Sequence, residues 1–263
     1  MNNAISQIQV PQAVSQAASQ GTIVEQSRAV AEVAAAVSTA RQFPRNTSWA
    51  VEQMQMLCQR LAVAQRAFYS VPNRGSGLSV HIARELSRIF GNVDYGVREL
   101  SRDDDKGESE MQAWAWDVET NVRSTRSFIV PHAKSTRGGR KELTDLNDIY
   151  LNNQNVAARA VRECIFSILP GWFLADAEQI LRQTLERGDG KPIEQRRIDA
   201  IDMFKGIGVT EKQLTVRLGK EVGQWGPREV ADLAKIWTSI NQDGIPANEF
   251  FPEQVVEIPG APK

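Results

Sequence analysis

The feature that most constrains the fold is a change of hydrophobic period at Gly91. Before this glycine, Ile82, Leu86 and Ile89 recur at helical spacing, and Ser79 stands where a helix cap is expected. After it, apolar and polar residues alternate, as they do in half-buried strands. A chain that changes from helix to strands in this way is predicted to belong to the α+β class.

Three strands are expected in this alternating region. They are predicted over residues 95–100, 111–118 and 126–130. The first turn falls at residues 103–107 and the second near Asn121, and both are short enough to join neighbouring strands. The prediction is therefore an antiparallel three-stranded β-meander.

The tryptophans bear on which face of this sheet is buried. On the second strand, Trp114 and Trp116 alternate with Ala113 and Ala115. Aromatic side chains can stack on nucleic-acid bases, but they also fill protein cores. We expect core packing for both tryptophans. We expect the same of three others, which lie in helical context: Trp172, Trp225 and Trp237.

Helices are expected on both sides of the strands in the sequence. Residues 132–153 are polar and are expected to be irregular, and a core helix is predicted over 154–169. Thr47 or Ser48 can cap an earlier helix, which is predicted to end before Pro72, with a Gly/Ser loop after it. Later helices are predicted at 175–187, 193–206, 211–218 and 227–241.

This pattern predicts four parts of the chain. A flexible Ala/Gln-rich N-terminal arm covers residues 1–46, with one possible helix over residues 22–41. The α+β core covers residues 47–172. A helical C-terminal region covers 173–245, and a proline-bearing flexible tail covers 246–263.

Composition narrows the class of protein. The net charge of −1 means that any nucleic-acid site must come from local clustering of Lys and Arg. Cys58 and Cys164 lie in apolar stretches and are expected to be buried thiols, and the two histidines give no zinc-type spacing. With neither a membrane span nor a signal peptide in view, we expect a cytoplasmic, reducing location.

The segment from Arg123 to Lys141 is basic and contains no Asp or Glu. Gly138 and Gly139 within it allow a ligand to approach the backbone closely. Flexible cationic side chains suit a phosphate backbone, although a solvated loop that pairs with acidic residues 103–105 is an equal alternative. Its cationic residues are Arg123, Arg126, Lys134, Arg137, Arg140 and Lys141.

The predicted core helix favours a nucleic-acid site. Asn155, Arg159 and Arg162 fall on one stripe, with Asn153 just before the helix. These residue types can bind phosphates without requiring one base sequence. The alternative is a solvated face on which Arg159 pairs with Glu163. A second stripe, formed by His81, Arg84 and Arg88, is expected to be solvated surface.

The sequence offers little support for catalysis. It contains neither a Walker-type phosphate loop nor an obvious nucleophile and base. Acidic residues that might bind metal in a nuclease, Asp94, Glu110, Asp117 and Glu119, lack the lysine expected beside such a cluster. We therefore expect no enzyme activity, catalytic residue, metal site or cofactor.

Three stretches resemble the phage RecT/Redβ-type single-strand annealing proteins. They are GLSVHIARELSRIFGNVDYGVREL, SEMQAWAWDVETNVRSTRSFIVPH and LTDLNDIYLNNQNVAARAVRECIFSILP. The resemblance covers the order of elements over residues 47–241 and is most specific over 78–170. It implies a strand-and-helix core, ring or helical-filament assembly, and ATP-independent annealing of single-stranded DNA held in a basic groove.

The resemblance also implies partners and site residues. The partners are single-stranded and annealed duplex DNA, further copies of the chain, a phage exonuclease and the host single-strand binding protein. Arg123 and Arg126 match the groove more weakly than the others. The residues that match it by position are Lys134, Arg137, Arg140, Lys141, Asn153, Asn155, Arg159 and Arg162.

The expected function is thus DNA annealing in phage recombination and repair. Two alternatives remain open at this point. One is a protective single-stranded DNA-binding protein that does not anneal, and the other is a structural phage assembly protein. Salt-dependent DNA binding separates the first two functions from the third, because phosphate contacts weaken as salt rises.

Overall fold

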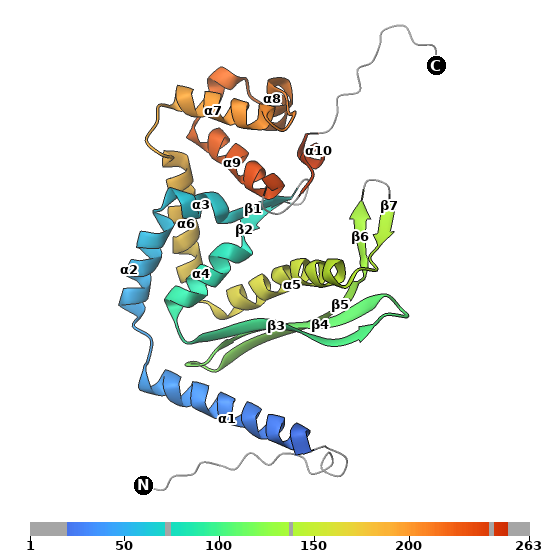
Figure 1. Cartoon of the computed structure of the whole chain (residues 1–263). Helices are drawn as coiled ribbons and strands as arrows, with labels where there is room; N and C mark the ends of the chain where they lie inside the picture. The colour runs from blue at the N-terminus through green and yellow to red at the C-terminus, as the bar shows by residue number, and fades with distance from the viewer. Residues whose placement is uncertain (1–19, 72–74, 137–138, 242–244, 252–263) are drawn as a thin grey trace. The chain divides into compact units, whose positions relative to one another are not determined.

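The computed structural model describes residues 20–71, 75–136, 139–241 and 245–251. It confirms a mixed α+β fold with a three-stranded antiparallel sheet. The chain divides into two compact units, residues 1–44 and 45–263. The first unit contains helix α1 (Gln20–Gln42), which confirms the helix expected in the arm. The second contains every other described element (Figure 1).

The second unit begins with two helices and a hairpin where one long helix was predicted. Helix α2 (Thr47–Cys58) is followed by α3 (Leu61–Arg66) and strand β1 (Phe68–Val71). Strand β1 pairs with β2 (Gly75–Leu78), so the expected Gly/Ser loop is partly a strand. The prediction failed because β1 is stabilised by a distant residue: the Ser70 N–H donates to Ser239 Oγ at 2.8 Å.

Helix caps were predicted with mixed success. The cap of α2 is Asn46, whose side chain accepts from the Trp49 N–H at 3.0 Å, and not Thr47 or Ser48. Ser79 caps α4 (Val80–Phe90) as predicted, and α4 ends at Gly91 with φ 77°. The three apolar residues predicted to face inward from this helix are buried.

The sheet has the strand order β3-β4-β5. Its strands are β3 (Val93–Asp103), β4 (Glu108–Asp117) and β5 (Val122–Pro131), each longer than or displaced from the predicted range. All pairs are antiparallel, and a bulge interrupts β3 between Glu99 and Ser101. In the register, Trp114 lies opposite Gly96 on β3 and Thr125 on β5, so these three positions share one face.

The segment expected to be irregular, residues 132–153, is ordered. Strands β6 (Ala133–Thr136) and β7 (Gly139–Glu142) form a hairpin. Helix α5 (Leu146–Ile168) then begins eight residues before its predicted start. Asp145 starts the helix early, because its carboxylate accepts from the N–H groups of Asn147 and Asp148.

The C-terminal helices match their predictions more closely. Helices α8 (Glu211–Leu218) and α9 (Pro227–Asn241) have the predicted bounds, and α7 (Ile193–Lys205) differs by one residue. Helix α6 (Gly171–Arg187) begins four residues before its predicted start. A short 3-10 helix, η2 (Val222–Gln224), and helix α10 (Ala247–Phe250) complete the described chain.

Two large hydrophobic clusters hold the second unit together, and a small third one is formed by Met111, Val130 and Ala157. The larger one joins α2, α4, α5, α6 and the inner face of the sheet, and includes both cysteines, which are buried as predicted. The smaller one joins α7 to α10 around the fully buried Trp225. Helix α9 contributes to both clusters, because Ala231 belongs to the first and Leu233 to the second.

No single helix among the described residues is long and apolar enough to cross a membrane. Helices α5 and α6 pass that test only as a pair, and the chain bends by 117° between them.

Candidate nucleic-acid interface

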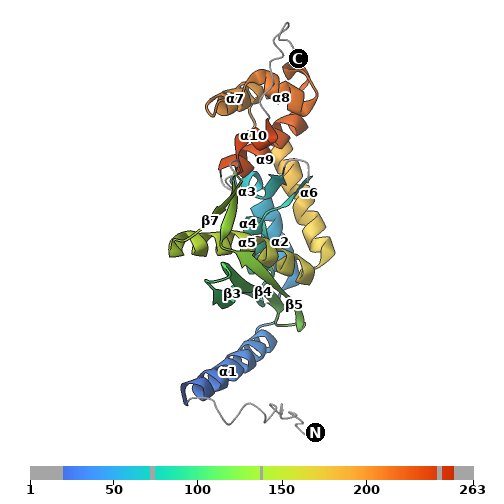
Figure 2. The same ribbon diagram turned by 90° about the vertical axis from the view of Figure 1, so that its right-hand side faces the viewer.

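Helix α5 covers one face of the β3–β4–β5 sheet (Figures 1 and 2). Its buried residues include Ala157, Val161 and Cys164. The Cys164 thiol lies 3.7 Å from the backbone oxygen of Ala113 on β4, so the helix packs closely on the sheet. Small alanines on β4 permit this approach, because a larger side chain would hold the helix away.

The side of α5 turned away from the sheet carries the predicted polar stripe. Asn155 and Arg159 are exposed, and the Arg162 side chain is 15% exposed. Arg162 pairs with Glu163 at 2.8 Å and stacks 4.4 Å from the Tyr69 ring centroid. Glu163 therefore binds Arg162 and not Arg159, the partner considered from the sequence. Among the described residues, Arg159 forms no ion pair.

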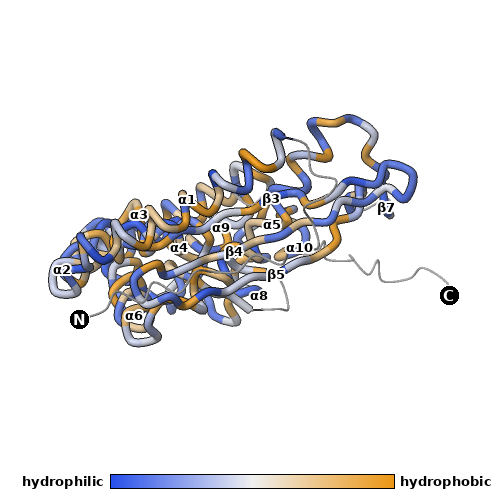
Figure 3. The backbone as a smooth tube through the Cα atoms, turned by 90° about the horizontal axis from the view of Figure 1, so that it is seen from below, coloured by the Kyte–Doolittle hydropathy of each residue, from blue (hydrophilic) through white to orange (hydrophobic). Residues whose placement is uncertain are grey.

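The β6–β7 hairpin rises on the same side of the sheet as α5 (Figures 1 and 2). Lys134 and Lys141 are direct cross-strand partners in it, so two positive charges share one face of the hairpin. Arg140 pairs with Glu142 at 2.8 Å, which neutralises part of its charge. The end of the hairpin near β7 is hydrophilic (Figure 3). Arg137 lies outside the described residues.

The two arginines of β5 point to opposite faces of the sheet. Arg126 is the cross-strand partner of Ala113, so it lies on the face covered by α5. Arg123 is the partner of Trp116, on the other face. Both are exposed. The structure therefore separates these two residues, which the sequence had suggested belong to one groove.

Asn153 lies inside the protein, apart from the exposed stripe. Its side-chain amide donates to Ser109 Oγ at 3.0 Å, and Ser109 Oγ lies 2.8 Å from Nε2 of His132. The Asp104 carboxylate is 3.8 Å from Nδ1 of the same histidine. Ser109, His132 and Asp104 thus approach the arrangement of a hydrolytic triad. Ser109 is fully buried, however, so a substrate has no access to its hydroxyl in this conformation.

The acidic residues considered from the sequence as a metal cluster have other partners. Asp117 forms an ion pair with Arg45 at 2.8 Å. Glu119 accepts from the Arg45 N–H at 2.9 Å and from the Asn92 side chain at 2.7 Å. Within the described part of the chain, no three His, Cys, Asp or Glu side chains gather in a way that could hold a metal ion.

The prediction that Trp114 and Trp116 fill the core was wrong. The buried apolar positions of β4 are Met111, Ala113 and Ala115, and the tryptophans are partly exposed on the opposite face. Alternation assigned the two faces correctly. Hydrophobicity could not show which face α5 covers, because the helix packs on the face with the small alanines and not on the face with the large tryptophans.

The remaining tryptophans differ from one another. Trp225 is fully buried and Trp237 packs against the second cluster, so core packing is confirmed for both. Trp172 touches the Phe173 ring but is 49% exposed, so the prediction fails for it.

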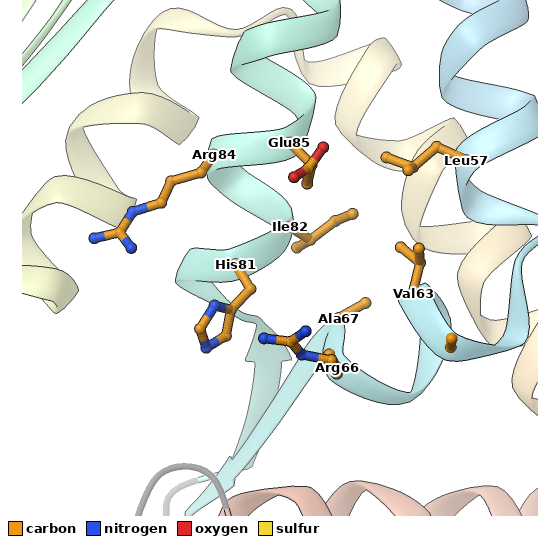
Figure 4. Close-up of a pocket in the computed structure, with 9 residues that line it drawn as sticks. Leu57, Val63, Arg66, Ala67, His81, Ile82, Arg84 and Glu85 are labelled. Carbon is orange, nitrogen blue, oxygen red and sulfur yellow. The ribbon is translucent and has the colours of Figure 1, made fainter.

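A hollow of about 360 Å³ lies between α2, α3 and α4 (Figure 4). Part of the predicted His81 stripe borders it, since His81 and Arg84 are among its lining residues. Arg88 instead pairs with Glu85 at 2.6 Å. The hollow combines apolar walls with a rim of mixed charge, formed by Leu57, Val63, Ala67, Ile82, Arg66, His81, Arg84 and Glu85.

A second hollow, of about 250 Å³, lies between β2, α6 and α9. Three cations and two carboxylates border it, and Lys235 pairs there with Asp232 at 2.8 Å. Its net charge is therefore small.

Comparison with known proteins yields no relative. No protein-family model matches the chain, and no curated protein or solved structure matches it either.

Proposed function

We propose that this protein binds single-stranded DNA through its phosphates and anneals complementary strands without ATP. The observation that carries the proposal is the polar stripe of Asn155, Arg159 and Arg162 on the outer side of α5, where Asn155 and Arg159 are exposed and Arg162 is mostly covered and paired with Glu163. The Lys134–Lys141 pair stands on the same side of the sheet. At 1.5 Å per residue, about 24 Å of helix separate the start of α5 from Arg162.

The chemistry of this stripe suits annealing. Arginine and asparagine can hold phosphates, and contacts made to phosphates leave the Watson–Crick edges of the bound strand free to pair. Net charge also favours the proposal. A protein with an overall charge of −1 and a local basic strip can assemble without strong repulsion between subunits.

We further propose that the chain acts as an oligomer, a ring or a helical filament, in phage recombination and repair. The resemblance of residues 78–170 to RecT/Redβ-type annealing proteins supports this part of the proposal. It also suggests a partner exonuclease that makes the single strand, and the host single-strand binding protein as a contact. A cytoplasmic location in the bacterial host follows from that role.

The first test is the pairing of two complementary oligonucleotides, one carrying a fluorescent label, with purified protein and without ATP. We expect faster pairing that weakens as salt rises. Tight binding to each strand without faster pairing would indicate a protective binder. If neither strand binds, the proposal fails and a structural role in assembly becomes the better explanation.

The second test removes the stripe. Replacing Arg159 and Arg162 with Ala should weaken binding to all base sequences alike. It should also reduce the slope of log affinity against log salt by about 0.7 for each phosphate that the protein no longer neutralises. The matched control replaces Arg217 and Arg228, two exposed arginines of the C-terminal helices, with Ala. An equal fall in affinity in both variants would show a general charge effect and contradict the assignment.

A further inference from the structure

The face of the sheet turned away from α5 has an aromatic centre. Cross-strand partners share a face, so Trp114 stands beside Gly96 and Thr125, and Trp116 stands beside Asp94 and Arg123. The two tryptophans are two residues apart on β4, which places them about 6.8 Å apart along the strand. They form a two-ring surface on the sheet.

Gly96 allows the first ring to lie close against the backbone. A Cβ atom built on Gly96 would lie 2.5 Å from Cζ2 of Trp114 and 2.6 Å from its Cη2. Only glycine lets the indole lie this close to β3. The ring therefore rests on the strand instead of standing out into solvent, and this fixes its plane before any ligand binds.

Hydrogen bonds within the protein hold the polar edges of both rings. Nε1 of Trp114 donates to Asp94 Oδ2 at 2.7 Å, and Nε1 of Trp116 donates to Asn121 Oδ1 at 3.1 Å. Asn121 itself has φ 60°, a left-handed conformation that asparagine tolerates well. A ligand would thus meet oriented aromatic surfaces whose N–H groups need no further acceptor.

Two arginines flank the rings. The guanidinium of Arg98 lies over the Trp114 ring, 4.8 Å from its centroid, so a base would stack there by displacing the guanidinium or by stacking on it, and Arg123 stands directly across from Trp116. Neither arginine forms an ion pair with another residue that the structure describes. Aromatic rings with such arginines beside them are the combination that binds single strands, because bases stack on the rings while phosphates meet the cations.

We propose that this outer face, centred on Trp114 and Trp116, stacks the bases of single-stranded DNA. The proposal rests on the proposed function and adds a second binding surface to it. Stacking engages the flat faces of bases, so the pairing edges stay free for annealing. It is also tolerant of base sequence, as an annealing protein requires.

A large protein partner fits this face less well than a nucleic-acid strand does. The residues next to the rings are polar, among them Gln112, Thr125 and Ser127. Stable protein interfaces bury about 800 Å² on each partner and have apolar centres. Two aromatic rings, with Ile129 as an exposed apolar side chain further along the same face, provide a smaller apolar area than that.

The test compares binding to an oligonucleotide of thymidines and to an abasic oligonucleotide of the same length and charge. Replacing both Trp114 and Trp116 with Leu should lower affinity for the first by at least about fivefold and leave affinity for the second unchanged. It should also abolish the quenching of tryptophan fluorescence by the thymidine strand. The control, Trp172→Leu, removes an exposed tryptophan elsewhere and should change neither result.

A second variant tests the proposal even if the double Leu variant does not fold. Gly96→Ala keeps both tryptophans and every charge but pushes the Trp114 ring off the strand. It should reduce the quenching and the affinity for the thymidine strand only. If the Leu variant binds both oligonucleotides as the wild type does, the stacking surface is refuted while phosphate binding stands.

Two further outcomes would also be decisive. A change in oligomer size with unaltered DNA affinity would mean that the face is covered by a second copy, and would overturn the stacking proposal. If the wild-type protein binds neither oligonucleotide, the proposed function itself has failed. This result differs from a selective fall in affinity for the thymidine strand, so the two proposals fail in distinguishable ways.

Discussion

Arg45 anchors the start of the second unit through one side chain. Its guanidinium donates to the backbone oxygens of Phe90 and Gly91 and to both carboxylate oxygens of Asp117, at 2.8–3.0 Å. It also stacks 3.7 Å from the centroid of the Phe90 ring. Both partners of the ion pair are buried, with side chains 8% and 4% exposed. Removing one partner would leave the other charge without compensation.

We therefore expect Asp117→Asn to lower the free energy of unfolding by about 3–5 kcal/mol, as measured by urea denaturation. The control is Glu85→Gln, which breaks the exposed Glu85–Arg88 pair and should cost less than about 0.5 kcal/mol. A similar loss of unfolding free energy in the two variants would mean that the buried pair stabilises the fold no more than the exposed pair does.

The same pair predicts a dependence on pH. Burial alone would raise the pKa of Asp117, but hydrogen bonds from Arg45 and Thr120 outweigh burial, and the pKa is lowered. A carboxylate with a lowered folded-state pKa stabilises the fold above its unfolded pKa of about 3.9, and this stability is lost as pH falls through the folded value. The stability gap between the wild type and Asp117→Asn should thus narrow below about pH 4. A gap that stays constant down to about pH 2, below the usual range of the Asp pKa, would contradict this mechanism.

At the scale of elements, locally encoded features were predictable and non-local ones were not. The α4 helix was predicted with its cap and its buried face because Ser79 and the apolar spacing lie within the helix itself. The β1 strand was missed because Ser239, far along the chain, binds it. Asp145 was a readable cap signal for α5, but the polar residues that follow it obscured the early start.

The candidate site shows the same division. Periodicity alone placed Asn155, Arg159 and Arg162 on one stripe, since a stripe depends only on helical geometry, but it could not show that Arg162 is mostly covered. It could not show that Asn153 points inward, because the Ser109 hydroxyl that binds it comes from another element. The roles of Trp114 and Trp116 were misjudged for a similar reason, since the position of α5 decides which face of the sheet is buried.

A substitution in the β6–β7 hairpin is predicted to weaken DNA binding without lowering the stability of the fold. Lys134 and Lys141 oppose each other directly, and like charges in this relation are unfavourable by about 0.2–1 kcal/mol. Lys141→Glu should therefore keep or raise the unfolding temperature while weakening DNA binding, as measured by thermal denaturation and fluorescence anisotropy. Lys141→Thr serves as the uncharged comparison. A variant that binds DNA as tightly as the wild type would remove the hairpin from the site.

At the scale of the whole molecule, α9 couples the two hydrophobic clusters. Besides its apolar residues, Thr238 donates to the backbone oxygen of Gln65 at 2.7 Å, and Ser239 accepts from the Ser70 N–H. These bonds tie α9 to α3 and β1 of the first cluster. Residues 45–251 should consequently unfold as one cooperative structure and not as two domains.

Calorimetry tests this coupling. We expect one transition in which the calorimetric and van't Hoff enthalpies agree. Ser239→Ala leaves the buried Ser70 N–H without its acceptor, which should cost about 1–3 kcal/mol and shift that transition without splitting it. Ser127→Ala, on the exposed side of β5, is the control and should leave the midpoint nearly unchanged. Two separate peaks would show that the clusters unfold independently.

The position of β5 at an edge of the sheet has a consequence for colloidal behaviour. An edge strand presents unpaired backbone groups that can recruit other strands into aggregates, and charged side chains oppose this. Arg123 and Arg126 lie on opposite faces of β5, so each face of this edge strand carries a positive charge that opposes pairing with another strand. Neutralising them would remove that electrostatic barrier, and the resulting protein would be limited by its solubility at high concentration even where its fold is intact.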